Sequence, residues 1–177
     1  MTSFLPVLLI GISLSMDAFS LALVYGMIGI SKKKKIVLSF IVGVYHYIMP
    51  LIGLMIGSII DHITFINLHI IAAFILIYIG IDLIISNHKE EKTHSLSMIG
   101  MLLFGLSVSI DSLTIGIGLR EITTLQRISA ITFSLCSILF TYLGLILGHI
   151  IGNKIGTYSK ILGGTILIII AIIMFIE

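Results

Sequence analysis

Two aspartates stand alone inside long apolar segments, and each is flanked by hydroxyl side chains. Asp17 lies in "SLSMDAFSLAL", and Asp111 lies in "SVSIDSLTIGI", 94 residues later. On a helix, the residues four before and three after a given position share its face. The residues at these positions are Ser13 and Ser20 around Asp17, and Ser107 and Thr114 around Asp111. Each segment therefore presents one carboxylate between two hydroxyls.

Oxygen donors of this kind suit a hard cation. If the two segments face each other, Asp17 and Asp111 share one cage of carboxylate and hydroxyl oxygens. Two carboxylates close together in a low dielectric cannot both stay ionised without a shared cation or proton. Oxygen-rich sets without thiolates suit Mg, Ca or Mn rather than Cu(I) or a structural zinc ion. The pattern predicts a divalent-cation site; the alternative is a structural role, with each aspartate protonated or hydrogen-bonded to a hydroxyl.

A third polar group, His46, lies in the apolar stretch "YHYIMP". Pro50 has no N–H to bond the His46 carbonyl, so an acceptor is left free at that level. The imidazole is a candidate further ligand, which would favour Mn over Mg because imidazole suits transition metals. It is equally a candidate proton carrier or a hydrogen-bonded structural histidine.

Membrane helices are the elements that must position these groups. The chain is 58% hydrophobic and 10% charged, against about 25% charged in an ordinary soluble domain. Apolar runs of about 20 residues are long enough to cross the hydrocarbon core as helices. We expect an all-α membrane protein with one transmembrane domain, residues 1–177. Its six expected spans are roughly Phe4–Ile28, Ile36–Ile60, Asn67–Ser86, Leu96–Leu119, Ile128–Ile151 and Tyr158–Ile176.

The basic residues predict how the spans are oriented. The loops after spans one, three and five hold eight lysines, whereas the other loops hold only Arg120 and Arg127. By the positive-inside rule, the lysine-bearing loops are cytoplasmic and both termini lie outside. No basic residue precedes Lys32, and the first apolar run is too long for a signal sequence, so we expect it to remain as a span. The run "KKKK" is interpreted as a topology anchor, with a lipid-regulatory patch as the alternative.

The sequence also contains an internal repeat. The aspartate segments align at an offset of 94 residues, and "LIGLMIGSII" from Leu51 resembles "YLGLILGHII" from Tyr142. "IIAAFILIYIG" likewise parallels "ILGGTILIIIA" in the third pair of spans. The predicted repeats are residues 1–86 and 96–177, joined by a cytoplasmic loop, residues 87–95. Because each repeat has three spans, the second copy must be inverted, as in many secondary transporters.

The glycines of this repeat have a packing interpretation. Gly53 and Gly57 in the first copy correspond to Gly144 and Gly148 in the second, and both pairs have four-residue spacing. Small residues at this spacing let membrane helices approach closely. We therefore expect these glycines to lie at helix–helix contacts.

Four of these segments together resemble a known family. "SMDAFSLAL", "MPLIGLMIG", "SIDSLTIGIGL" and "ILGGTILIIIAI" are similar to the MntP family, bacterial inner-membrane proteins described as manganese efflux pumps, within the LysE-like transporter superfamily. The resemblance covers nearly the whole chain. It implies export of Mn(II) from the cytoplasm, with the essential aspartates falling on Asp17 and Asp111. The chain differs at His46, where the family commonly has Glu or Gln, and "LALVYGM" is similar to related sporulation-associated membrane proteins.

The sequence thus predicts a multi-pass protein of the cytoplasmic membrane that is a secondary transporter and not an enzyme. It would export Mn(II) or a similar divalent cation, and without a nucleotide-binding motif it would use an ion gradient, with protons as the counter-ion. We expect no nucleic-acid partner and no resident cofactor, and the oligomeric state is left open. The alternatives are an exporter of amino acids or other small solutes from the same superfamily, and a non-transporting sporulation-type membrane protein. An intramembrane aspartyl protease is a further alternative, although its usual G-x-G-D context is missing around Asp111.

Overall fold

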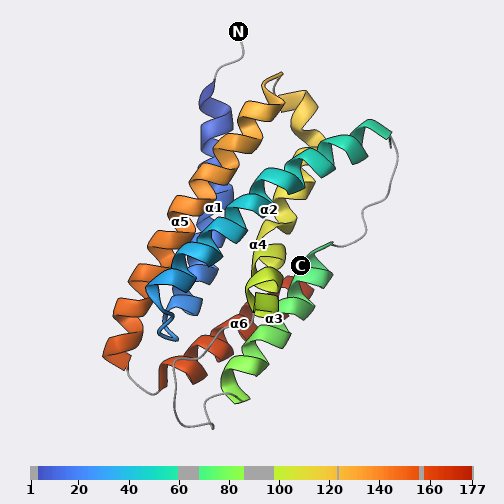
Figure 1. Ribbon diagram of the computed structural model, residues 1–177. Coiled ribbons are helices and arrows are strands. Elements are labelled where there is room, and N and C mark those ends of the chain that lie inside the picture. The colour runs from blue at the N-terminus through green and yellow to red at the C-terminus, as the bar shows by residue number, and fades with distance from the viewer. Residues whose placement is uncertain (1–3, 60–67, 86–97, 123, 156–157, 177) are drawn as a thin grey trace.

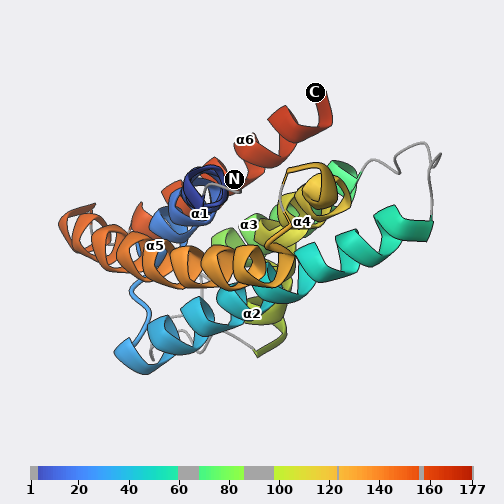
Figure 2. The same ribbon diagram turned by 90° about the horizontal axis from the view of Figure 1, so that it is seen from above.

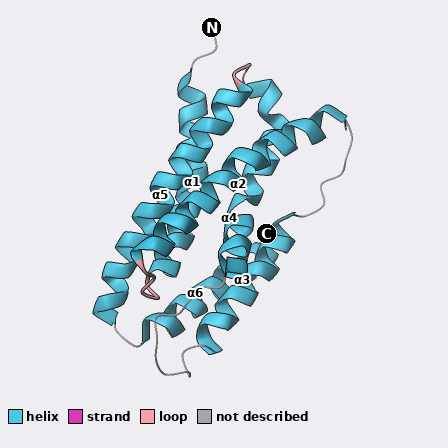
Figure 3. Ribbon diagram, in the orientation of Figure 1, coloured by secondary structure: helices cyan, strands magenta, loops and turns pink. Residues whose placement is uncertain are grey.

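The computed structural model describes residues 4–59, 68–85, 98–122, 124–155 and 158–176, and every regular element among them is a helix (Figures 1 and 3). The prediction of an all-α protein is confirmed for these residues. The expected loop 87–95 lies outside the described residues. In chain order the helices are α1 (Phe4–Gly26), α2 (Lys32–Ile59), α3 (Leu68–Ile85), α4 (Met98–Ile122), α5 (Gln126–Ile155) and α6 (Ser159–Ile176).

Four of the helices, α1, α2, α4 and α5, are long and apolar enough to cross a membrane, and α6 contains a shorter apolar stretch, Ile161–Ile173. The protein is therefore a multi-pass membrane protein. Crossing of the membrane by α3 and α6 stays a prediction. The largest shifts from the expected bounds are at the start of α2, at Lys32 rather than Ile36, and at the end of α5, at Ile155 rather than Ile151. Lysine is a good helix former, so the basic run continues the helix instead of remaining in the loop.

The helices associate in pairs that are distant in sequence. The most extensive contacts are α1 with α5, α2 with α4, and α3 with α6, and α2 also packs against α5. Seen from above, α5 lies between α1 and α2 (Figure 2). By contrast, α1 and α4, which carry the two aspartates, touch over a much smaller region.

Glycines allow α1 and α5 to run side by side in the same direction. A Cβ at Gly144 would lie 2.6 Å from the Phe19 carbonyl oxygen. A Cβ at Gly148 would overlap the Leu23 carbonyl oxygen, and one at Gly152 would overlap that of Met27. Each contact is with backbone, so a side chain at these positions would push the helices apart. The packing role predicted for Gly144 and Gly148 is confirmed.

Helices α2 and α4 also pack closely at glycines. A Cβ at Gly53 would overlap the Leu113 carbonyl oxygen, and one at Gly57 would lie 2.7 Å from the Ile117 carbonyl oxygen. Gly116 of α4 faces the Pro50 backbone in the same way. The predicted packing role of Gly53 and Gly57 is confirmed as well. Both pairs are parallel, because residue numbers rise together along their contacts.

The buried apolar side chains form two clusters. The larger cluster joins α1, α2, α3, α4, α5 and α6, and it includes the stacked rings of Tyr25 and Phe104, whose centroids are 4.8 Å apart. The smaller cluster lies toward the N-terminal end of α1, where Val7 packs with Leu119 and Phe133. The two clusters therefore contact α1 on either side of Asp17.

Candidate metal centre

Helices α1 and α4 place the two aspartates at one level. The helices run in opposite directions (Figure 1), and the stack of Tyr25 on Phe104 fixes their register. Tyr25 follows Asp17 by eight residues, and Phe104 precedes Asp111 by seven. At 1.5 Å per residue, the carboxylates lie about 12 Å and about 10 Å beyond the stack in the same direction. The charge of Asp111 acts on Asp17, so the two carboxylates are close enough to interact.

The flanking hydroxyls follow the aspartates onto the same faces but differ in exposure. Ser13, Asp17 and Ser20 are all exposed on α1. On α4, Ser107 is buried, whereas Asp111 and Thr114 are half-buried. At the aspartate level, the polar side chains of α1 are thus more exposed than those of α4.

Two of the hydroxyls already donate their hydrogens to backbone. Ser20 Oγ donates to the Met16 carbonyl at 2.9 Å, and Ser107 Oγ donates to the Phe104 carbonyl at 3.0 Å. Such bonds to the preceding turn satisfy the hydroxyl hydrogen within the helix. They leave the oxygen lone pairs free, because a hydroxyl has two acceptor sites besides its single donor. These oxygens can therefore contribute to a cation site without losing a hydrogen bond.

His46 is fully buried in α2, with an exposed fraction of 0%. Its Nδ1 lies 3.0 Å from the Val42 carbonyl, and its Nε2 has no hydrogen-bond partner among the described residues. Because the carbonyl can only accept, Nδ1 carries the proton and the Nε2 lone pair is free. In the described part of the chain, however, no three His, Cys, Asp or Glu side chains gather as a metal-binding group. In this conformation His46 is therefore not assembled with the two aspartates.

A pair of buried hydroxyls between α1 and α5 was not predicted as part of the site. Ser15 Oγ and Ser137 Oγ are 3.3 Å apart, and Ser15 also donates to the Gly11 carbonyl at 2.5 Å. Thr141, one turn further along α5, is fully buried, and its hydroxyl has no partner in the described helices. Two features of the sequence are consistent with this pair. Ser15 has the counterpart Ser109 in the repeat. Ser137 and Thr141 have the four-residue spacing of one helix face.

Apolar side chains close the space along α1 and α4 on both sides of the aspartates. On the side of the lysine run, the Tyr25–Phe104 stack joins the two helices, and both rings are almost completely buried. On the other side, Ile10 of α1 and Leu119 of α4 belong to the smaller apolar cluster. Asp17 and Asp111 thus lie between two apolar clusters along α1 and α4.

Comparisons with known proteins place these features in a family. Residues 29–175 match the family described as "Mntp: Putative manganese efflux pump". The chain is 32% identical to the "Putative manganese efflux pump MntP" of Halalkalibacterium halodurans over 165 residues, which is 92% of this chain and 91% of that protein. It is also 32% identical to the protein of the same name from Bacillus mycoides, over 93% of this chain and 91% of the relative. No solved structure matches the chain.

The two kinds of match cover different parts of the proposed site. The family match begins at residue 29, after α1, and so includes Asp111 but not Asp17. The alignments with whole relatives extend over about nine-tenths of the chain. The family is a transporter family and not an enzyme family by its description. On both grounds, the chain belongs to the MntP family, which is described as "Putative manganese efflux pump".

Proposed function

We propose that the protein is a secondary transporter that exports Mn(II), or a similar divalent cation, from the cytoplasm in exchange for protons. The cation would bind between Asp17 and Asp111, with oxygen atoms from Ser13, Ser20, Ser107 and Thr114. The observation that carries the proposal is the meeting of two carboxylates at one level of two antiparallel helices. The family supports manganese as the substrate.

The charge balance of the site supports a cation in particular. The sequence has no Lys or Arg before residue 32 and none between residues 93 and 119, so α1 and α4 supply no positive charge near the aspartates. Two carboxylates close together in a low dielectric favour a shared cation or proton, because their like charges repel each other. A bound divalent cation would offset this repulsion, and in its absence a proton would. Metal-binding carboxylates must be deprotonated. Binding of the metal by the two aspartates would therefore release a proton, and loss of the metal would let a proton return.

The arrangement of the helix pairs supports an inverted repeat. The first helix of each predicted repeat packs in parallel on the second helix of the other repeat, as α1 does on α5 and α4 does on α2. Such exchange between copies is what an inverted-repeat transporter needs, because its substrate site lies where the repeats meet. We propose that the repeats are related in this way, with both termini outside and the lysine run in the cytoplasm.

His46 enters the proposal as an additional ligand that α2 would bring to the cation in another conformation. Its free Nε2 lone pair is of the type that favours Mn over Mg. The change His46→Gln keeps a polar side chain but removes the imidazole. We expect it to reduce the preference for Mn over Mg in transport more than it reduces transport itself. Equal loss of Mn and Mg transport would remove His46 from the ligand set.

Transport by purified protein in liposomes tests the proposal directly. Liposomes loaded with a manganese-sensitive dye would report Mn(II) entry, which a proton gradient of the correct sign should accelerate and a protonophore should slow. Asp17→Asn and Asp111→Asn should each abolish the flux, because an amide keeps the shape of the side chain but not its charge. Thr165→Ala is a suitable control, because Thr165 is exposed on α6 and its hydroxyl donates to the preceding turn. Full flux in both asparagine variants would contradict the proposed site.

A further inference from the structure

The four long helices carry completely buried polar side chains between the two apolar clusters. On each helix, these side chains lie in sequence between the residues that pack in the smaller cluster and those that pack in the larger one. Each of them has an exposed fraction of 0%. They are Ser15 of α1, His46 of α2, Ser109 and Ser112 of α4, and Ser137 and Thr141 of α5. These six residues are called the buried polar set below.

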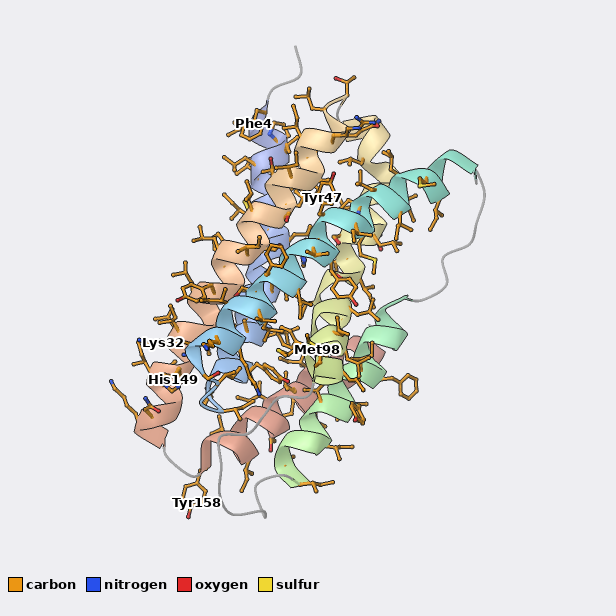
Figure 4. All side chains as sticks on the ribbon, viewed as in Figure 1. Phe4, Lys32, Tyr47, Met98, His149 and Tyr158 are labelled. Carbon is orange, nitrogen blue, oxygen red and sulfur yellow. The ribbon has the colours of Figure 1, made fainter. Side chains whose placement is uncertain are left out.

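Contacts of α5 with α1 and with α2 bring members of the set together. Ser15 Oγ and Ser137 Oγ are 3.3 Å apart across α1 and α5. A Cβ at Gly43 of α2 would overlap a side chain of α5, so these two helices meet one turn before His46. This point is near the middle of α2, where Figure 4 labels Tyr47.

Helix α4 passes beside His46 as well. A Cβ at Gly105 would lie 2.8 Å from the Tyr45 ring, and one at Gly116 would overlap the backbone of Pro50. His46 lies between Tyr45 and Pro50 in α2. The stretch of α4 beside it is therefore the one that contains both α4 members of the buried polar set.

Most hydroxyl hydrogens of the set are already bonded. Ser109 and Ser112 donate to carbonyls of the preceding turn of α4, at 3.1 Å and 2.6 Å. Ser15 donates to a carbonyl of its own helix, so the hydrogen between Ser15 and Ser137 comes from Ser137. The lone pairs of these oxygens remain available as acceptors, because a hydroxyl has two acceptor sites besides its single donor.

Two polar atoms of the set, His46 Nε2 and Thr141 Oγ1, have no hydrogen-bond partner among the described residues. His46 Nε2 can only accept, because Nδ1 carries the proton, whereas the Thr141 hydroxyl both donates and accepts. Burial of a polar atom without a hydrogen bond is costly, and buried polar atoms nearly always bond to protein or to ordered water. The set has more acceptors than donors, so it calls for a small ligand that donates hydrogens.

We propose that the buried polar set binds water, which donates a hydrogen to His46 Nε2 and bonds to the Thr141 hydroxyl. Buried water typically makes about three hydrogen bonds to polar groups that would otherwise lack a partner. A metal ion in the set would need a countercharge, and the two acidic side chains that the structure describes lie outside it: Asp17 is exposed and Asp111 is half-buried. Water carries no charge and needs none.

In the proposed transport cycle, water would occupy His46 Nε2 whenever α2 is away from the cation, and the metal would displace it. This step rests on the proposed function, whereas the water site itself does not. The experiments below measure labelling and stability without transport. A buried polar set without water would therefore leave the paired-aspartate site standing, and loss of the transport proposal would leave the water site standing.

Hydroxyl-radical labelling of the purified full-length protein in lipid nanodiscs tests for the water. A short X-ray pulse forms radicals from water, these radicals oxidise adjacent side chains, and mass spectrometry locates the added oxygen. We expect His46 to be labelled although its exposed fraction is 0%. Phe133 also has an exposed fraction of 0%, but it packs in the smaller apolar cluster and should stay unlabelled. An unlabelled His46, or equal labelling of His46 and Phe133, would overturn the proposal.

The substitution Thr141→Val tests the second bond of the water. Valine has nearly the shape of threonine but no hydroxyl, so loss of a water bond should lower the folding equilibrium constant about fivefold. Thr132→Val is the matched control on α5, because the buried Thr132 hydroxyl donates to the Ile128 carbonyl at 2.9 Å. Such a bond within one helix adds little stability, so the control should change the constant less than about twofold.

A more stable Thr141→Val variant would overturn the proposal, because removal of a hydroxyl from a dry site relieves the cost of its burial. An effect equal to that of Thr132→Val would also overturn the assignment of water to Thr141. If Thr141→Val fails to fold, the labelling of His46 and Phe133 in the wild type decides.

Discussion

The contact between α1 and α5 gives a quantitative prediction for Gly148→Ala. The new Cβ would overlap the Leu23 carbonyl oxygen and would lie 2.9 Å from the Leu23 carbonyl carbon and 3.0 Å from Gly26 Cα. All three are backbone atoms, so no side-chain rotation relieves the overlap. Only separation of the helices by several tenths of an ångström or more restores ordinary packing distances.

The cost follows from the weaker van der Waals attraction between the separated helices. A gap of about 0.5–1 Å forfeits about a quarter to a half of each atom–atom attraction of about 0.1–0.2 kcal/mol. Overpacking of this kind costs about 1–3 kcal/mol. Alanine regains about 0.5–1 kcal/mol of helix propensity over glycine. We therefore expect Gly148→Ala to lower the free energy of unfolding by about 1 kcal/mol, within a range of about 0–2.5 kcal/mol.

The chain supplies both a reporter and a control for this measurement. Cys136 is the sole cysteine and is half-buried in α5, so a thiol-reactive dye reports its exposure on unfolding in detergent. Gly118→Ala makes the same change on α4, where a Cβ would meet no atom within 4 Å. The control should be unchanged or more stable by up to about 1 kcal/mol. Equal stability of the two variants would refute the close-packing account of α1 and α5.

Three further predictions concern other parts of the fold. Phe104→Ala removes a fully buried ring from the stack with Tyr25 and should lower the free energy of unfolding by about 3–5 kcal/mol in the same assay; a decrease below about 1 kcal/mol would argue against the stack as the α1–α4 contact. Gly29→Ala places a side chain at a φ of +83° and should cost about 1–2 kcal/mol although its surroundings are open; no change would contradict the left-handed turn. A double-mutant cycle of Ser15→Ala and Ser137→Ala should give a coupling free energy of about 0.6 kcal/mol, which is typical of hydrogen bonds between membrane helices. Additive effects of the two substitutions would show that the hydroxyls do not interact.

Much of the fold was predictable because apolar length and charge determine membrane helices. The expected first span, Phe4–Ile28, and the observed α1, Phe4–Gly26, differ by about one half-turn. The glycine repeat predicted close helix contacts, and these contacts exist. Which helices make them was not predictable, because a four-residue glycine pattern shows that a face is flat but does not identify its partner. The prediction that spans one and four face each other holds only over a small region, since α1 packs mainly on α5.

The residues of the candidate site were predictable from the sequence, but their exposure and packing were not. Helical periodicity placed the hydroxyls around Asp17 and Asp111, and the structure puts them on those faces. Their unequal exposure was not predictable, because it depends on how α4 is covered by α2 and α3, which the repeat alone does not define. The free Nε2 of His46 and the buried hydroxyl pair of Ser15 and Ser137 likewise depend on tertiary packing.

The central claim is that the paired aspartates carry manganese out of the cell, and cellular metal content tests it most directly. Manganese would be measured by elemental analysis in a manganese-sensitive host that expresses the wild type, Asp17→Asn or Asp111→Asn at equal membrane abundance. The account predicts low cellular manganese with the wild type, and in both variants manganese as high as in cells without the protein. Unchanged manganese with well-inserted wild type, or low manganese in either variant, would contradict it.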